Sequence, residues 1–335
     1  MGNILVTGGA GFIGSHAVLA LMRKKKQVVV IDNFSNAHLS VMDNIKKIIG
    51  KKPIVINGDV RDLKLLDKIF TDYPIEAVIH FAGLKAVAES VANPLAYFAI
   101  NVAGSISLLD IMKKHQIHKF VFSSSATVYG VPQTLPLTEE SPVNPINPYG
   151  KTKLMIEEVL KNICLADKNW RIASLRYFNP CGADASGFIG ENPRSTPNNL
   201  MPILLRVAGG EIEKLHIYGD DYDTTDGTGV RDYIHVVDLV AAHLKTLDYL
   251  DNSHGFTIFN LGRGHGYSVL DMVKTFEKSI GRNIPLPAII TKRRLGDTPA
   301  VWADASLAEK KLSWRAEKNL EDMCKDSWQF YQNNK

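Results

Sequence analysis

The sequence is poor in cysteine and has no excess of charge of either sign. It contains three cysteines, Cys164, Cys181 and Cys324, which are widely spaced and lack the paired spacing of a disulfide framework or a zinc site. Because such sparse cysteine use fits a reducing compartment, we expect a cytoplasmic protein. The 39 basic residues nearly balance the 35 acidic ones, and the basic clusters are short. A nucleic-acid-binding surface is therefore not expected.

Long apolar runs are also missing from the sequence. No run reaches the roughly 20 apolar residues that cross a membrane, and no charged segment followed by an apolar run precedes the first expected strand. We therefore predict neither a membrane anchor nor a secretion signal. His80, His235 and His265 have the character of packed or loop histidines, and we predict no bound metal.

Short β-rich runs alternate with helix-like stretches in the first half of the chain. Many of these runs are apolar throughout, as expected for parallel strands that are covered on both faces. The alternation predicts an α/β fold of the Rossmann type, a doubly wound parallel sheet with helices on both sides. The expected strands cover residues 4–7, 27–31, 54–57, 77–80, 120–123 and 172–176.

A glycine-rich segment, Gly8 to Gly14, follows the first expected strand and opens a helix. Its spacing fits a dinucleotide-binding loop, in which bare backbone lets a pyrophosphate approach the amide donors of a helix N-terminus. Asp32 ends the second strand, where a carboxylate can accept hydrogen bonds from an adenosine ribose and would repel a 2′-phosphate. The sequence therefore predicts NAD rather than NADP. The alternative is that Asp32 and Asn33 only cap a turn.

Tyr149 and Lys153 form the candidate catalytic pair. A tyrosine four residues before a lysine lies on the same helix face, and Ser125 follows a strand whose end faces the same crevice. A nearby ammonium should lower the pKa of the phenol, so that Tyr149 can move a proton while a nicotinamide moves a hydride. The pair could also arise by chance, and Ser125 could be a turn residue, but the cofactor loop favours the catalytic interpretation.

Beyond about Phe178 the composition shifts towards Gly, Pro, Asn and Asp. We predict that residues 1–178 form the NAD-binding domain with the catalytic residues, and that residues 179–335 mainly form a smaller lobe for substrate. Ligands of open parallel sheets lie beyond the carboxyl ends of the strands. The second lobe should therefore close over that edge.

Longer and chemically varied segments resemble the extended short-chain dehydrogenase/reductase family, and within it the enzymes that invert C4 of UDP-hexoses. The likeness runs nearly end to end, through residues 80–87, 123–130, 175–180, 197–202 and 226–235. It implies that Tyr149 takes the proton of the sugar 4-hydroxyl while C4 gives a hydride to NAD. The resulting 4-keto sugar rotates and takes the hydride back on its other face. Ser125 would bind the reacting oxygen, and Lys153 would hold the nicotinamide ribose.

The resemblance also implies a homodimer and a set of binding residues. Arg231 and Arg294 supply the guanidinium groups that suit a diphosphate, although surface ion pairing is the alternative. On the cofactor side the set is Gly8, Gly11, Phe12, Ile13, Gly14, Asp32, Asn33, Ser35, Asn36, Asp59, Val60, Phe81, Ala82, Gly83, Lys85, Tyr149, Lys153 and Phe178. On the UDP-sugar side it is Lys85, Ser125, Tyr149, Asn179, Asn199, Leu200, His216, Ile217, Tyr218, Arg231, the segment from Arg294 to Asp297, and Val301.

Val301 bears on the range of substrates. In the resembling enzymes a bulky tyrosine at this position restricts the 2-acetamido group, and a smaller residue admits it. Valine therefore implies that UDP-N-acetylglucosamine and UDP-N-acetylgalactosamine are substrates in addition to UDP-glucose and UDP-galactose. The alternative is that Val301 only packs the lobe.

Three other functions compete with epimerisation. A 4,6-dehydratase would need an acid and a base beside the serine, where this chain has Ala126 and Thr127. A dehydrogenase that releases its cofactor would accumulate NADH. A noncatalytic NAD sensor would have no need of Tyr149 and Lys153, and their joint presence argues against it.

Overall fold

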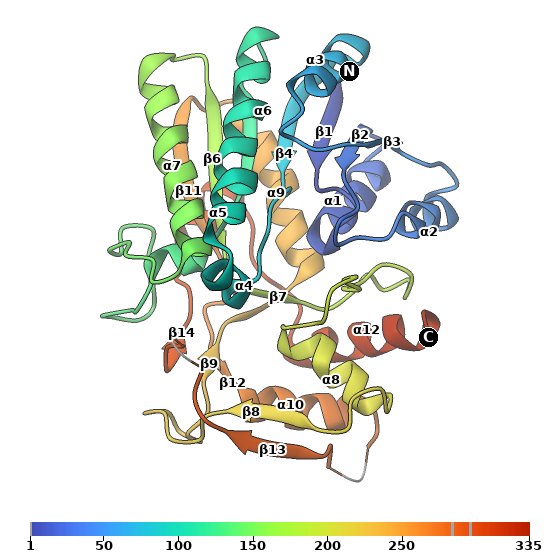
Figure 1. Cartoon of the computed structure of the whole chain (residues 1–335), viewed down its shortest axis with the longest axis vertical. Helices are drawn as coiled ribbons and strands as arrows, with labels where there is room; N and C mark the ends of the chain where they lie inside the picture. The colour runs from blue at the N-terminus through green and yellow to red at the C-terminus, as the bar shows by residue number, and fades with distance from the viewer. Residues whose placement is uncertain (1, 283–284, 295–296) are drawn as a thin grey trace.

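The computed structural model describes residues 2–282, 285–294 and 297–335, which form two lobes (Figure 1). The larger lobe is built on a seven-stranded sheet of order β11-β6-β5-β4-β1-β2-β3, in which every strand pairs in parallel. The predicted Rossmann-type fold is confirmed. Its strands are β1 (Asn3–Thr7), β2 (Gln27–Asp32), β3 (Ile54–Asn57), β4 (Ile75–His80), β5 (Lys119–Ser125), β6 (Arg171–Tyr177) and β11 (Gly255–Leu261).

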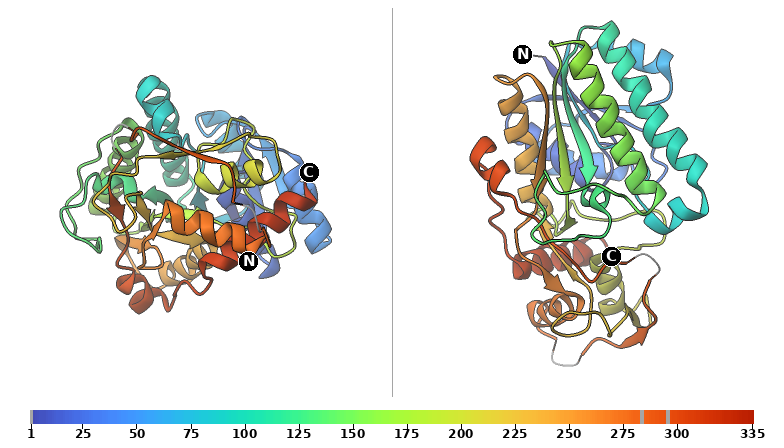
Figure 2. Two further views of the ribbon diagram at one scale, coloured as in Figure 1. Left: turned by 90° about the horizontal axis from the view of Figure 1, so that it is seen from below. Right: turned by 90° about the vertical axis from the view of Figure 1, so that its left-hand side faces the viewer.

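Helices cover both faces of this sheet, as the two views in Figure 2 show. One layer contains α1 (Phe12–Arg23), α9 (Val236–Leu250) and α11 (Ser306–Leu312). The other contains α3 (Leu63–Asp72), α6 (Ala103–Lys114) and α7 (Pro148–Ala166). Four shorter helical segments and α2 complete the lobe: α2 (Ser40–Ile49), α4 (Val87–Ala92), α5 (Pro94–Tyr97), the π-helical η1 (Phe98–Val102) and the 3-10 turn η2 (Ala126–Tyr129).

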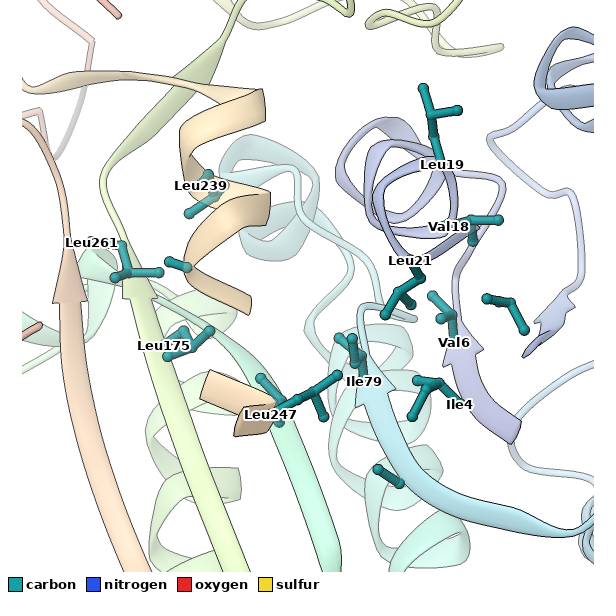
Figure 3. Close-up of a cluster of buried hydrophobic side chains, with 14 of the residues drawn as sticks. Ile4, Val6, Val18, Leu19, Leu21, Ile79, Leu175, Leu239, Leu247 and Leu261 are labelled. Carbon is teal, nitrogen blue, oxygen red and sulfur yellow. The ribbon is translucent and has the colours of Figure 1, made fainter. Parts of the chain in front are cut away.

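Apolar side chains fill the space between the sheet and each layer. On the side of α1 and α9, strand residues such as Ile4, Val6 and Ile79 pack against Leu21 and Leu247 (Figure 3). Every residue of β1 is buried, as expected for a strand in the middle of a sheet that is covered on both faces. The carboxyl end of β1 is therefore held rigidly at the point where the strand order reverses between β1 and β4.

The smaller lobe has its own core and small sheets. Its elements surround buried side chains such as Leu204, Ile217 and Phe276, and they lie below the carboxyl ends of the large sheet in Figure 1. They are β7 (Asn179–Cys181), α8 (Leu200–Ala208), β8 (Leu215–Tyr218), β9 (Val230–Arg231), β10 (Tyr233–His235), β12 (Tyr267–Ser268), α10 (Val269–Ser279), β13 (Ala288–Thr291), β14 (Ala300–Val301) and α12 (Leu320–Asn333).

The chain returns to the large lobe after residue 178. Strand β11 extends the sheet beside β6, and α9 packs against α1. Strand β11 was not among the predicted strands, because it lies within a region rich in turn residues. The second half of the chain thus builds the small lobe and also covers one face of the large one.

One continuous helical stretch among the described residues, Pro94–Lys114, is long and apolar enough to cross a membrane. The sequence analysis found no run of that length. The stretch combines α5, η1 and α6, of which α6 packs against α3 in the layer over the sheet. Of its most apolar 18-residue window, 44% is buried.

Candidate active site

The glycine loop after β1 has the tight geometry that its sequence predicts. Gly8 adopts φ +65°, a conformation that favours glycine. A Cβ on Gly14 would lie 2.2 Å from the carbonyl oxygen of Gly8, so the loop and α1 can approach only because position 14 has no side chain. Helix α1 has no side-chain cap at Gly11 and no acidic residue in its first turn. Its first amide groups therefore suit a pyrophosphate, which the glycine spacing predicts there.

Asp32 lies beside this loop at the end of β2. Its carboxylate accepts hydrogen bonds from the backbone amides of Ala10 at 2.9 Å and Phe34 at 2.8 Å. Burial raises the pKa of Asp32, and these amide hydrogen bonds oppose the rise. The loop and the carboxylate are thus locked together, as a site for the adenosine half of NAD requires.

Other predicted cofactor residues gather at neighbouring strand ends. Asp59 follows β3, and its ion pair with Arg61 lowers its pKa to about 2. The amides of Phe81 and Ala82 bond to the carbonyl and hydroxyl oxygens of Thr7, which joins the ends of β4 and β1. Asn33, Ser35, Asn36, Val60, Gly83 and Lys85 lie in the same strand-end loops, whereas Phe178 follows β6.

The predicted catalytic residues come together where β5 ends and α7 begins. Ser125 is the last residue of β5, and Tyr149 lies in the first turn of α7, which Asn147 caps through a 2.8 Å bond from the amide of Gly150. Burial raises the pKa of Tyr149 to about 12, against a hydrogen bond from Ser125 that lowers it. The serine hydroxyl and the phenol are therefore partners.

Lys153 does not lower the pKa of Tyr149 in the way that the sequence analysis expected. Its ammonium donates to the carbonyl of Ser123 at 2.6 Å and lies 5.8 Å from the centre of the Tyr149 ring. The ammonium is thus bonded to β5, and it is not among the groups that lower the pKa of Tyr149. Burial also lowers the pKa of Lys153 to about 8. The hydrogen bond that favours the phenolate comes from Ser125 instead.

The predicted diphosphate residues lie in the small lobe. Arg231 in β9 forms an ion pair with Asp297, and the guanidinium of Arg294 lies 4.0 Å from the centre of the Tyr218 ring. His216 and Tyr218 point away from the core of the lobe and their rings stack, whereas the side chain of Ile217 is buried in that core. Any contact of Ile217 with a ligand would therefore use its backbone. Leu295 and Gly296, inside the predicted segment, lie outside the described residues.

Val301 lies next to two other predicted residues. It pairs with Arg231 in the small sheet of β14 and β9, and it packs against the cluster that contains buried Phe178. Asn179 begins β7 directly after Phe178, and its amide bonds to the carbonyl of Asp232. The structure therefore brings the proposed sugar-pocket residue to the junction of the lobes.

Glu191, which was not among the predicted residues, contacts two residues that were. Its Oε1 accepts hydrogen bonds from Lys85 Nζ and from Asn199 Nδ2, each at 2.8 Å. Lys85 belongs to the large lobe, whereas Asn199 directly precedes α8 in the small lobe, with Leu200 as the first residue of that helix. The carboxylate thus joins two predicted substrate residues across the lobes. Glu191 lies in no recognisable motif, and its contacts depend on residues distant in the chain, so no local pattern could have indicated it.

Among the residues described, no group of three or more His, Cys, Asp and Glu side chains is placed to hold a metal ion. His80 is buried between the hydroxyls of Thr7 and Ser105, and burial lowers its pKa to about 3. It is therefore a neutral structural histidine at the pH of the cell.

Comparison with known proteins places this geometry in context. The family model described as GDP-mannose 4,6 dehydratase matches residues 5–327. The chain is 51% identical to UDP-glucose 4-epimerase of Bacillus subtilis (strain 168), covering 99% of this chain and 97% of that protein. It is 50% identical to UDP-glucose 4-epimerase of Homo sapiens, with the same coverage of 99% and 97%.

Solved structures agree with these likenesses. UDP-glucose 4-epimerase from Bifidobacterium longum, in complex with NAD+ and UDP, has a TM-score of 0.96 at 48% identity, covering 99% of this chain and 98% of that one. The enzyme from Stenotrophomonas maltophila, with bound NAD and formylated UDP-arabinopyranose, has a TM-score of 0.96 at 44% identity, covering 100% and 99%.

Proposed function

Because this chain belongs to the UDP-glucose 4-epimerases of the extended short-chain dehydrogenase/reductase family, we propose that Ser125, Tyr149 and Lys153 carry out its reaction. The chain is an NAD-dependent isomerase that interconverts UDP-glucose and UDP-galactose through a 4-keto intermediate. The observation that carries the residue assignment is the convergence of Ser125, at the end of β5, with Tyr149 and Lys153, in the first turns of α7, at the strand ends that adjoin the glycine loop.

Each of the three side chains has a defined task in this proposal. NAD, when bound, supplies the acceptor and then the donor of the hydride at C4. Tyr149 takes the proton of the 4-hydroxyl and returns it after the sugar has presented its other face. Ser125 binds the same oxygen and assists ionisation of the phenol. Lys153, fixed by the carbonyl of Ser123, offers its remaining ammonium hydrogens to the cofactor ribose.

The residues beside Ser125 favour epimerisation over dehydration. Ala126 has no titratable group, and the hydroxyl of Thr127 donates to Ser125 at 3.0 Å. Elimination of water would require an acid and a base at these positions. The match to a family model with a dehydratase description therefore reflects the shared fold of the wider family.

We assign NAD to the glycine loop, Asp32 and the other cofactor residues of residues 1–178, and the UDP-sugar mainly to residues 179–335. The uncapped first turn of α1 supports the first assignment, since it offers donors for a pyrophosphate. The pairs Arg231–Asp297 and Lys85–Glu191 support the second, because each holds the cationic side chain of a predicted substrate-binding residue. Substrate phosphates would compete with these carboxylates for the same cations.

The acetylated UDP-sugars are proposed as further substrates. Support comes from Val301, which is much smaller than tyrosine and lies beside Arg231 and Phe178. Wild type should interconvert UDP-N-acetylglucosamine and UDP-N-acetylgalactosamine, whereas Val301→Tyr should lose this activity and keep that on UDP-glucose. If wild type ignores acetylated sugars, or if both proteins handle them equally, Val301 is not the gate.

The proposed working form is a cytoplasmic homodimer. Support for the dimer comes from the outward faces of α6 and α7, which lie side by side in Figures 1 and 2. Ile106 on α6 and Met155 on α7 are 47% and 50% exposed. Apolar side chains gathered on one helical layer are suited to pairing with a second copy.

The proposed function is tested by product analysis. Purified protein incubated with UDP-galactose should form UDP-glucose until a constant ratio is reached, without added oxidant, because NAD is regenerated in each turnover. One NADH released for each sugar converted would instead show a dehydrogenase. A dehydrated sugar product would show that the adjacent Ala126 and Thr127 do not prevent elimination.

A further inference from the structure

A buried ion pair lies between α7 and the sheet, next to the catalytic residues. Glu157 and Arg176 are 2% and 3% exposed. Arg176 donates from Nη2 to Glu157 Oε2 at 2.6 Å and from Nε to Oε1 at 3.0 Å. Burying two charges is costly unless their hydrogen bonds are satisfied, so such a pair is seldom retained for stability alone. The roles proposed for Ser125, Tyr149 and Lys153 do not involve this ion pair.

Glu157 also holds the end of β5. Its Oε1 accepts a hydrogen bond from the hydroxyl of Ser124 at 2.6 Å. The residue before Ser124 is Ser123, whose carbonyl accepts from Lys153, and the residue after it is Ser125, the partner of Tyr149. The carboxylate therefore fixes the backbone between two residues that contact catalytic groups. A further bond from Ser174 at 2.8 Å ties the same carboxylate to β6.

Helical spacing puts Glu157 in register with the catalytic pair. It follows Lys153 by four residues and Tyr149 by eight, so that all three lie on one face of α7. Burial lowers the pKa of Lys153, and the negative charge of Glu157 acts against that effect.

Lys153 is surrounded by groups from several elements. The titratable or charged groups that face it are Tyr149 and Glu157 from α7 and His80 from β4, while the ring of Phe122 from β5 lies 4.8 Å from its ammonium. Of these groups, Glu157 is the carboxylate.

We propose that Glu157 is a positioning residue for the epimerisation. It holds the segment from Ser123 to Ser125 at the distance from α7 at which Ser125 meets Tyr149 and the Ser123 carbonyl meets Lys153, and its charge favours the ammonium form of Lys153. Arg176 orients the carboxylate so that it can accept hydrogen bonds from both β5 and β6. This role deepens the proposed function and rests on it.

A double variant separates positioning from stability. Glu157→Leu with Arg176→Met replaces both charges of the ion pair by apolar groups, so neither partner is left buried alone, and Lys153 keeps its hydrogen bond to the Ser123 carbonyl; the protein should therefore fold. We expect kcat to fall between about tenfold and 10²-fold, because a small misplacement of reacting groups costs that much, while the Kd for UDP and the bound NAD stay unchanged. Glu158→Gln, an exposed neighbour on the same helix, should change neither.

The single variant Glu157→Gln tests the effect of the Glu157 charge through the pH dependence of kcat. A residue with a purely structural role would leave that pH dependence unchanged. Activity requires the Lys153 ammonium and is lost as the pH rises through its pKa. Removal of the Glu157 charge should lower that pKa, so the alkaline limb of the kcat profile should shift to lower pH.

Two results would overturn the proposal. In one, the double variant keeps wild-type kcat while wild type is an active epimerase. In the other, the double variant loses kcat and UDP binding in equal measure. Inactive wild-type protein would instead contradict the proposed function.

Discussion

At Tyr149, burial and hydrogen bonding act on the phenol in opposite directions. Burial raises its pKa to about 12, and Ser125 lowers it. The motif predicted the residues but not this balance, because a sequence spacing does not show where the Lys153 ammonium points. In the structure that ammonium reaches the carbonyl of Ser123. The roles of Glu157 and Glu191 were also beyond prediction, since each depends on partners distant in the chain.

Loss of the phenolic hydroxyl should affect chemistry and spare binding. We expect Tyr149→Phe to reduce kcat by ~10²–10⁴-fold, the usual contribution of a general acid–base group, with little change in the Kd for UDP. Steady-state kinetics and calorimetric titration with UDP check the two parts. Unchanged turnover would remove Tyr149 from the mechanism.

The pH dependence of turnover should report Lys153. Its buried ammonium has a pKa of about 8, so kcat should decline as the pH rises above that value and the charge is lost. Lys153→Arg keeps a cation that does not titrate, and its profile should lack this decline even if its kcat is lower. A wild-type profile that stays level to pH 10 would contradict the assignment.

At the scale of elements, alternation of apolar runs and helices predicted the strands β1 to β6 and their common edge. The glycine spacing predicted the turn between β1 and α1 because only bare backbone permits that approach. The places of strand β11 and helix α9 in the large lobe were not predicted. They are set by packing against β6 and α1, which no local sequence pattern reveals.

Two glycines in the cofactor loop should differ in their tolerance of a methyl group. A Cβ at Gly14 meets the backbone of Gly8 at 2.2 Å, whereas one at Gly11 meets only the Gly8 carbonyl oxygen at 3.3 Å. Gly14→Ala should therefore lower the Tm and the content of bound NAD. Gly11→Ala should keep the Tm of the protein freed of NAD and lower only its affinity for NAD. Equal Tm values for the two variants would contradict this prediction, because they would show that the backbone of the loop can shift to accommodate a methyl group at position 14.

At the scale of the whole molecule, the lobes are joined by specific polar contacts. Arg23 on α1 forms an ion pair with Asp184 at 2.6 Å, and Lys85 forms an ion pair with Glu191. The composition change near Phe178 predicted a second lobe over the strand ends. These contacts depend on the relative placement of the lobes, which the sequence alone does not specify.

The outward layer of α6 and α7 should mediate self-association. We expect Ile106→Glu with Met155→Glu to convert a dimer into a monomer in light scattering after size exclusion, because four charges would be buried at a symmetric interface. Ile290→Glu, at an apolar site on β13 of the small lobe that is 59% exposed, is the control and should leave the dimer intact. A wild-type monomer would contradict the prediction.

In the proposed mechanism, one bound NAD takes the hydride from C4 and returns it to the same carbon. The direct measurement uses UDP-galactose that carries deuterium at C4, followed by nuclear magnetic resonance of the UDP-glucose formed. We expect that deuterium remains at C4 and that no NADH is released. Exchange of the deuterium with solvent hydrogen would show removal of a proton from C4 and would rule out hydride transfer to NAD.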